Sequence, residues 1–208
     1  MLFYLITRII TFIKNIFGIR NPTVEEQLET FKRLGFKLNK GVDIRSLIER
    51  WGERTGFPKN PYFFLYIVLG STTSEDPFIP VTNQVWHFDT ECIEDHGDYV
   101  KILENLKRIS SGELNFKNIE DYVDIREGKV SVSFDYKGKH YSWDLNVHDD
   151  WVDEELFSKI VKLTKEHKTN GRLTYLGTGG QDMVLGWATP EQMKSIKAKT
   201  RLNIKWMK

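Results

Sequence analysis

The chain has 208 residues, and its hydrophobic content of 40% excludes a largely disordered protein and allows a sizeable core. Cys92 is the only cysteine, which excludes an internal disulfide framework and a cysteine-rich zinc site and suits a reducing compartment such as the cytoplasm. The net charge of +1 hides an uneven layout, because residues 1–59 carry +5, residues 60–160 carry −11 and residues 161–208 carry +7. Such an acidic middle attracts a basic partner, unless the basic ends fold over it and cancel its charge.

Residues 1–20 are predicted to form an amphipathic, basic N-terminal helix. Arg8 and Lys14 interrupt its apolar run, which argues against a transmembrane span, and no small-residue cleavage site of a secretory signal follows. A helix of this kind lies in a membrane interface, on a partner or on the protein's own core. The side chains expected to face a membrane are Leu2, Leu5, Ile6, Ile9, Ile13, Ile16 and Phe17.

The next segments predict two helices followed by two strands. Thr23 and Glu26 form a capping box, and Asp43 caps a second helix. The continuous apolar run of residues 62–69 is typical of a central strand that is buried on both faces. Residues 85–92 alternate apolar and polar types, which predicts another strand.

The strongest pattern in the chain predicts a β-hairpin between residues 129 and 147. Apolar and polar residues alternate on both sides of Lys137-Gly138, and glycine in the second position suits a type I′ turn. If Tyr136 pairs with Lys139, six apolar side chains share one face, so that register and burial agree. They are Val130, Val132, Phe134, Tyr141, Trp143 and Leu145.

The remaining segments predict further helices and short strands. One helix begins at Gly97-Asp98, and another follows the acidic run of residues 149–155, whose carboxylates favour a helix N-terminus. Residues 173–185 predict two strands around a glycine-rich turn, with a helix from Thr189-Pro190 and a last strand after it.

These elements together predict the fold class. We expect residues 21–208 to form a single α+β domain with a mostly antiparallel sheet of about six or seven strands. The helices are expected mainly on one face of that sheet, and the amphipathic helix of residues 1–20 is additional to it.

Asp89 and Glu91 are the most specific candidates for catalysis. The sequence F-D-T-E at residues 88–91 resembles the first motif of DEDD-type 3′–5′ exonucleases, in which Asp-x-Glu on a strand binds two divalent metals. His148 and Asp153 have the spacing of that family's last motif. The resemblance implies a metal-dependent phosphodiesterase that uses Asp89, Glu91 and Asp153. It covers only these residues, and the separation between Asp89 and Asp153 is much shorter than in that family.

The other motifs do not predict chemistry. The glycines at 177–180 lack the Lys-Ser/Thr of a phosphate-binding loop and indicate a hairpin turn. His87, His140 and His148 have no regular metal-ligand spacing, and Cys92 lies on the apolar side of its strand. We therefore expect no metal site, no cofactor and an inert thiol. The basic C-terminus has no recognised nucleic-acid-binding motif, and we expect a solvated face there.

The charge layout favours a non-catalytic intracellular protein-binding domain with an acidic face. This character is that of small immunity proteins that neutralise basic toxins or nucleases, although no motif supports a family. A peripheral membrane accessory protein anchored by residues 1–20 is a further alternative. We expect a basic protein as partner rather than nucleic acid, bound by Asp121, Asp124, Asp144, Asp149, Asp150, Asp153, Glu154 and Glu155.

Overall fold

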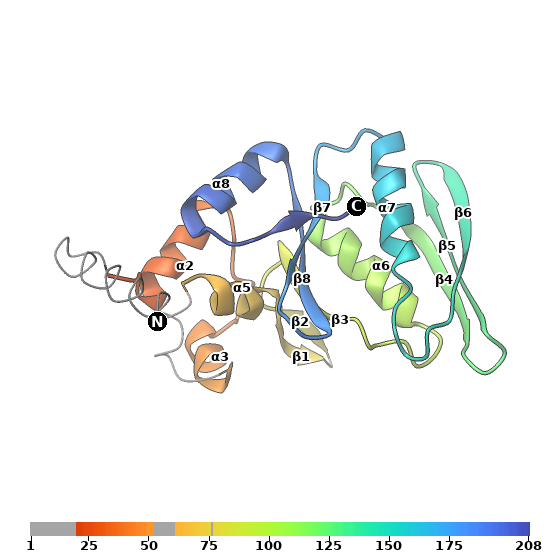
Figure 1. Ribbon diagram of the computed structural model, residues 1–208, viewed down its shortest axis with the longest axis horizontal. Coiled ribbons are helices and arrows are strands. Elements are labelled where there is room, and N and C mark those ends of the chain that lie inside the picture. The colour runs from red at the N-terminus through yellow and green to blue at the C-terminus, as the bar shows by residue number, and fades with distance from the viewer. Residues whose placement is uncertain (1–19, 52–60, 76) are drawn as a thin grey trace, which may run out of the picture.

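The computed structural model describes residues 20–51, 61–75 and 77–208, and it has an α+β fold (Figure 1). Six helices lie in the described part of the chain: α2 (Val24–Arg33), α3 (Ile44–Trp51), α5 (Phe63–Gly70), α6 (Asp98–Ile109), α7 (Glu155–Glu166) and α8 (Pro190–Thr200). The nine strands are β1 (Thr72–Glu75), β2 (Phe78–Pro80), β3 (Val85–Asp89), β4 (Lys117–Asp124), β5 (Lys129–Tyr136), β6 (Lys139–Leu145), β7 (Arg172–Gly177), β8 (Asp182–Ala188) and β9 (Lys205–Trp206).

The strands form three small antiparallel sheets rather than one. Their orders are β1-β2, β3-β8-β7-β9 and β4-β5-β6. The predicted α+β class and antiparallel pairing are therefore confirmed, whereas the prediction of a single sheet of six or seven strands is wrong. The sequence pattern identifies strands and neighbouring hairpin partners, but it does not say which hairpins join across a long connection.

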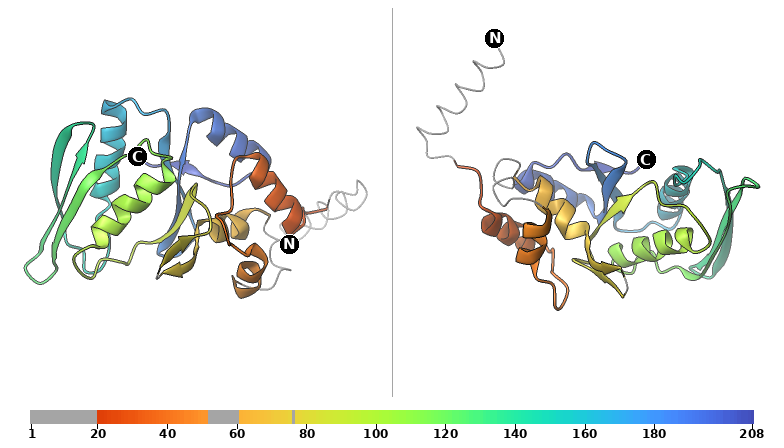
Figure 2. Two further views of the ribbon diagram at one scale, coloured as in Figure 1. Left: turned by 180° about the vertical axis from the view of Figure 1, so that it is seen from behind. Right: turned by 90° about the horizontal axis from the view of Figure 1, so that it is seen from below.

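The sheet β3-β8-β7-β9 separates two hydrophobic cores. Along β8, Met183 and Leu185 contact one core, and Val184 and Ala188 contact the other, as the two-residue period of a strand requires. The first core contains α6, α7 and the three-stranded sheet, and the second contains α2, α3, α5 and α8 (Figure 2). Helices therefore cover both faces of the central sheet, and the expectation that they lie mainly on one face is wrong.

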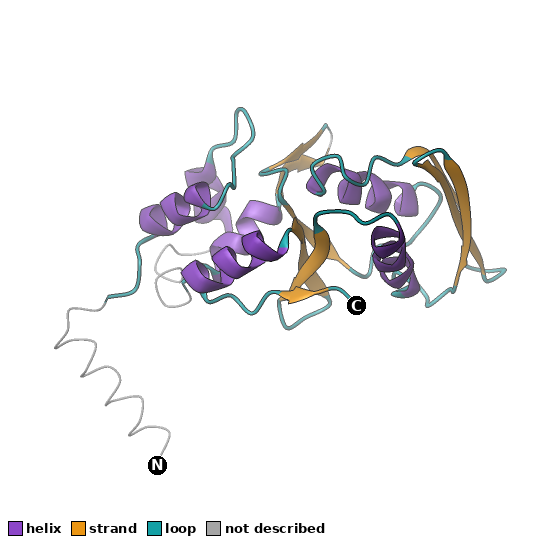
Figure 3. Cartoon of the chain, turned by 90° about the horizontal axis from the view of Figure 1, so that it is seen from above, coloured by secondary structure: helices purple, strands orange, loops and turns teal. Residues whose placement is uncertain are grey.

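The predicted hairpin is confirmed in register and in burial. Tyr136 pairs with Lys139, and Lys137 and Gly138 both have positive φ, as a type I′ turn demands. The inward residues of β5 are all buried, and β4 adds a third strand on the other side of β5. Figure 3 shows α6 and α7 lying between this three-stranded sheet and the central strands.

Residues 62–69 do not form the predicted strand, because α5 occupies Phe63–Gly70. The helix is buried from Leu65 to Gly70, and a helix buried on all sides has the same uninterrupted apolar run as a central strand. The side-chain oxygen of Gln27 on α2 accepts a hydrogen bond from the backbone N–H of Tyr62 at 2.8 Å. A tertiary contact thus supports the start of this helix, and the local sequence does not reveal that contact.

The amphipathic helix predicted for residues 1–20, with its seven membrane-facing side chains, falls outside the described residues apart from Arg20. It stays a prediction. Among the helices that the structure describes, none combines the length and the apolar character that crossing a bilayer requires.

Gly70 marks the close approach of α5 to β3, and this contact gives a testable prediction. A Cβ at Gly70 would lie 2.6 Å from the backbone nitrogen of His87, so Gly70→Ala should lower the free energy of unfolding by about 1–3 kcal/mol through overpacking. Gly177→Ala is the matched control, because a Cβ at Gly177 has open space around it. Equal midpoints of urea denaturation for the two variants would contradict the close packing of α5 on β3.

Candidate functional site

Three acid-rich segments carry most of the negative charge of the middle of the chain. Residues 89–98 contain five Asp or Glu, residues 120–124 contain three and residues 144–155 contain six, and none of these segments contains Lys or Arg. The first segment connects β3 to α6, the second ends β4, and the third connects β6 to α7. These segments can act as one binding surface only if the fold brings them together.

Backbone hydrogen bonds join the first segment to the third. The N–H of Val152 donates to the carbonyl of Thr90 at 2.8 Å, and the N–H of Ile93 donates to the carbonyl of Asp150 at 2.9 Å. An antiparallel bridge between Glu91 and Trp151 lies between these two bonds. The loops that precede α6 and α7 therefore run side by side.

The carboxylate of Asp121 joins the second segment to the first. It accepts hydrogen bonds from the N–H groups of Gly97, Tyr99 and Val100 at 2.7–3.2 Å. N–H groups at the start of a helix have no acceptor within the helix, so Asp121 supplies one for the start of α6. A negative charge there also interacts favourably with the helix dipole. Val123 strengthens the link by donating its N–H to His96 Nδ1 at 2.9 Å.

Asp153 has the same role at the start of α7. Its side chain is only 4% exposed, and it accepts from the N–H of Glu155 at 2.9 Å and from the N–H of Asn146 at 2.7 Å. The backbone N–H of Asp153 donates to the Tyr99 hydroxyl on α6 at 3.1 Å. Asp153 thus links the start of α7 to α6, and Asp121 links β4 to the start of α6. Both carboxylates accept hydrogen bonds that support the fold.

The other acidic residues of the predicted set are half-buried or exposed at this same edge. Figure 1 shows the loops before α6 and α7 and the β4–β5 turn at the lower edge of the molecule. Asp144, Asp149, Glu154 and Glu155 are exposed there, and Asp124 and Asp150 are half-buried. We call the surface formed by residues 89–98, 120–124 and 144–155 the acidic face.

The described carboxylates of the acidic face form ion pairs only with residues close in sequence. Within the described residues, no ion pair links a Lys or Arg of residues 161–208 to a carboxylate of the face. The ion pairs that do occur there are local, from Lys101 to Asp98 at 2.9 Å and from Lys159 to Glu155 at 2.8 Å. The hydrogen bonds from Lys101 and from the backbone N–H groups of Glu94 and Asp95 outweigh the effect of burial and hold the pKa of Asp98 below its ordinary value.

Two large aromatic side chains are exposed on the acidic face. Trp151 is 41% exposed and Tyr122 is 47% exposed, and the Tyr122 ring lies 5.2 Å from the ring of His96. Exposed Trp and Tyr are the residue types that most often dominate binding energy in protein interfaces. Neither residue was in the predicted binding set, although both lie in acidic runs, E-D-Y-V-D and D-D-W-V-D-E-E, whose carboxylates favour solvent exposure.

The residues of the exonuclease-like motif form no metal-binding group. Asp89 and Glu91 both accept hydrogen bonds from the side-chain amide of Gln181, while Asp153 is bonded to Asn146 and Glu155. Across residues 20–51, 61–75 and 77–208, no cluster of three or more His, Cys, Asp or Glu side chains has the arrangement to hold a metal ion.

His87 forms a close pair with Asp182 across β3 and β8. The His87 Nε2 and an Asp182 carboxylate oxygen lie 2.5 Å apart, and the Thr178 hydroxyl donates to the other oxygen at 2.6 Å. Burial opposes ionisation of Asp182, but these two hydrogen bonds hold its pKa below the ordinary value.

Burial, with the nearby carboxylates of Asp98 and Asp89, raises the pKa of Cys92 to about 12, so its thiol stays protonated at neutral pH.

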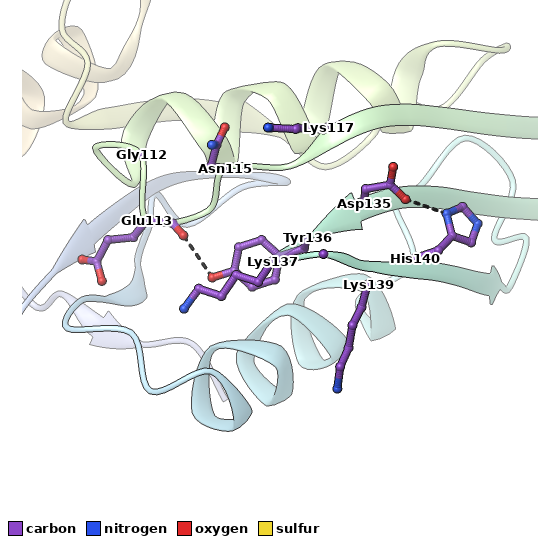
Figure 4. A pocket seen from close by; sticks show the side chains of 10 residues that line it. Gly112, Glu113, Asn115, Lys117, Asp135, Tyr136, Lys137, Lys139 and His140 are labelled. Atoms are coloured by element: carbon purple, nitrogen blue, oxygen red, sulfur yellow. Dashed lines mark hydrogen bonds and ion pairs between the residues drawn. The ribbon is translucent and has the colours of Figure 1, made fainter.

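A second charged feature lies at the tip of the β5–β6 hairpin. The cleft of about 650 Å³ in Figure 4 has Lys117, Lys137 and Lys139 in its lining. Asp135 faces His140 at 2.9 Å, and the Tyr136 hydroxyl donates to the carbonyl of Glu113 at 3.0 Å. The tip of the hairpin thus carries the ammonium groups of Lys137 and Lys139, with the Asp135 carboxylate beside them.

Comparison with known proteins gives no family for the chain. No protein-family model, no curated protein and no solved structure matches it significantly.

The structural role of Asp153 leads to a prediction about stability. Asp153→Ala removes the acceptor of two backbone N–H groups in a buried position, so it should lower the free energy of unfolding by about 2–3 kcal/mol. Glu154→Ala removes an exposed neighbouring side chain that makes no capping hydrogen bond, so it should change the free energy of unfolding by less than about 0.5 kcal/mol. Urea denaturation followed by circular dichroism measures both, and equal stabilities would refute the capping role of Asp153.

Proposed function

We propose that this protein is a non-catalytic binding protein whose acidic face engages a basic protein partner. One observation carries the proposal: three segments that are distant in sequence, none of which contains Lys or Arg, are hydrogen-bonded to one another. Folding would not by itself require this concentration of charge, because only Asp121 and Asp153 are used for capping.

The composition of the face supports a protein interface. Exposed Trp151 and Tyr122 provide apolar area with little conformational entropy to lose, and the surrounding carboxylates provide charge complementarity to Lys and Arg. A field of one sign also raises the association rate of an oppositely charged partner at low ionic strength. A basic toxin or nuclease, neutralised in the cytoplasm by an immunity-type protein, is the class of partner that we propose.

The hydrogen bonds of the carboxylates guide which of them we propose to bind the partner. Of the predicted set, we assign binding to Asp124, Asp144, Asp149, Asp150, Glu154 and Glu155. Asp121 and Asp153 are left out of the binding set because both carboxylate oxygens of each accept backbone hydrogen bonds. Asp124 uses only one oxygen in this way, to accept from the N–H of Glu127 at 2.9 Å.

Charge reversal of the acidic face should abolish capture of the partner without unfolding the protein. The variant Asp149→Lys, Asp150→Lys, Glu154→Lys in the full chain should weaken binding by about a hundredfold or more, because three favourable charge interactions become repulsive. The measurement is a pull-down from native lysate at two salt concentrations, followed by titration of the purified partner.

The matched control reverses three exposed carboxylates outside the face, namely Glu29→Lys, Glu166→Lys and Glu191→Lys. It makes the same change in net charge and should retain the partner. An equal loss of partner binding in both variants would mean that only the net charge of the protein matters. A captured partner that is acidic or neutral would refute the proposal.

A further inference from the structure

A cavity adjoins the acidic face, between the β1–β2 ribbon, β3 and the first turns of α6. It encloses about 730 Å³, and apolar side chains form much of its wall, among them Phe78, Trp86 and Val100. Asp89 and Asp98 line the cavity and also belong to the acidic face, so the cavity and the face are continuous. A pocket of this size with a few converging polar groups is typical of a binding site.

The charges around the cavity are mostly negative. Glu75, Asp89, Asp98 and Glu104 line it, whereas Lys101 is the one Lys or Arg among its described lining residues. The ammonium of Lys101 lies 2.9 Å from Asp98 and is neutralised there, and Glu104 pairs with Lys107 at 3.1 Å.

Within the described residues, Asp89 accepts hydrogen bonds from uncharged groups. Its oxygen accepts from the backbone N–H of Glu91 at 3.1 Å and from the amide of Gln181 at 3.3 Å. These neutral donors orient the Asp89 carboxylate but leave its charge uncompensated, and its side chain is exposed at the end of β3. An apolar cavity with an uncompensated carboxylate at its edge selects a ligand group with an apolar stem and a cationic head.

We propose that this cavity receives an arginine or lysine side chain of the basic partner. The aliphatic stem lies along Trp86, Phe78 and Val100, and the cationic head meets Asp89 and Glu75. This inference rests on the proposed function and assigns an anchoring pocket to the same surface. Anchors that fill a pocket at the centre of an interface dominate binding energy, whereas charges at the rim mainly affect the association rate.

The test is heteronuclear NMR of the full chain titrated with N-acetyl-arginine amide. Its control compound is N-acetyl-citrulline amide, which has the same shape without the charge. The arginine compound should shift the signals of Trp86, His87 and Val100. The citrulline compound should bind at least about tenfold more weakly, because its uncharged head loses the attraction to Asp89 and Glu75. Asp89→Asn should weaken binding of the arginine compound about tenfold, while Glu166→Gln, outside both the cavity and the acidic face, should leave its affinity unchanged.

Equal affinity for the two compounds, shifts spread over the acidic face instead of the cavity, or an unaffected Asp89→Asn variant would each overturn the inference. The affinity of the variants for the protein partner then distinguishes failure of this inference from failure of the proposed function. If Asp89→Asn retains full affinity for the partner and the triple reversal at 149, 150 and 154 abolishes it, the cavity inference is wrong and the acidic face stands. If the cavity binds the arginine compound but no basic protein depends on the face, the proposed function is wrong and the cavity is a site for a free cationic compound.

Discussion

The capping of two helices by two carboxylates is the constraint on which the acidic face depends. Asp121 reaches from β4 to the start of α6, and Asp153 caps α7 while its own N–H donates to Tyr99 on α6. Each carboxylate satisfies backbone donors that would otherwise lack partners and places a negative charge at the positive end of a helix. These contacts bring together loops whose other carboxylates repel one another. The two capping carboxylates therefore position the loops, and the remaining carboxylates of those loops supply most of the surface charge.

The charges of the molecule are consequently separated in space. Lys137 and Lys139 lie at the tip of the β5–β6 hairpin, at the end opposite Asp144. The central sheet sets the helices α2, α3, α5 and α8 apart from the hairpin. A molecule charged in this way orients an approaching basic partner before contact. Exposed Trp151 and the adjoining cavity then supply the apolar contacts that long-range charge does not provide.

The sequence predicted those parts of the fold in which local rules are sufficient. The hairpin register followed from two-residue periodicity and a Lys-Gly turn, and the boxes at Thr23 and Thr189 cap α2 and α8 as expected. The apolar run that became α5 was assigned wrongly, because complete burial removes the periodicity that separates helix from strand. The division into three sheets depends on contacts between distant segments, and no local pattern encodes them.

The candidate site was predicted in composition but not in arrangement. The acidic residues were identified from charge alone, yet the assignment of Asp121 and Asp153 to capping required the hydrogen bonds of the folded chain. Photo-crosslinking in living cells tests the central claim most directly, with p-benzoyl-phenylalanine in place of Trp151 and, as a control, in place of Leu38, which is equally exposed at 41%. We predict a crosslink from position 151 to a basic protein, absent from position 38 and lost on charge reversal at 149, 150 and 154. No crosslink from position 151, or the same products from both positions, would contradict the account.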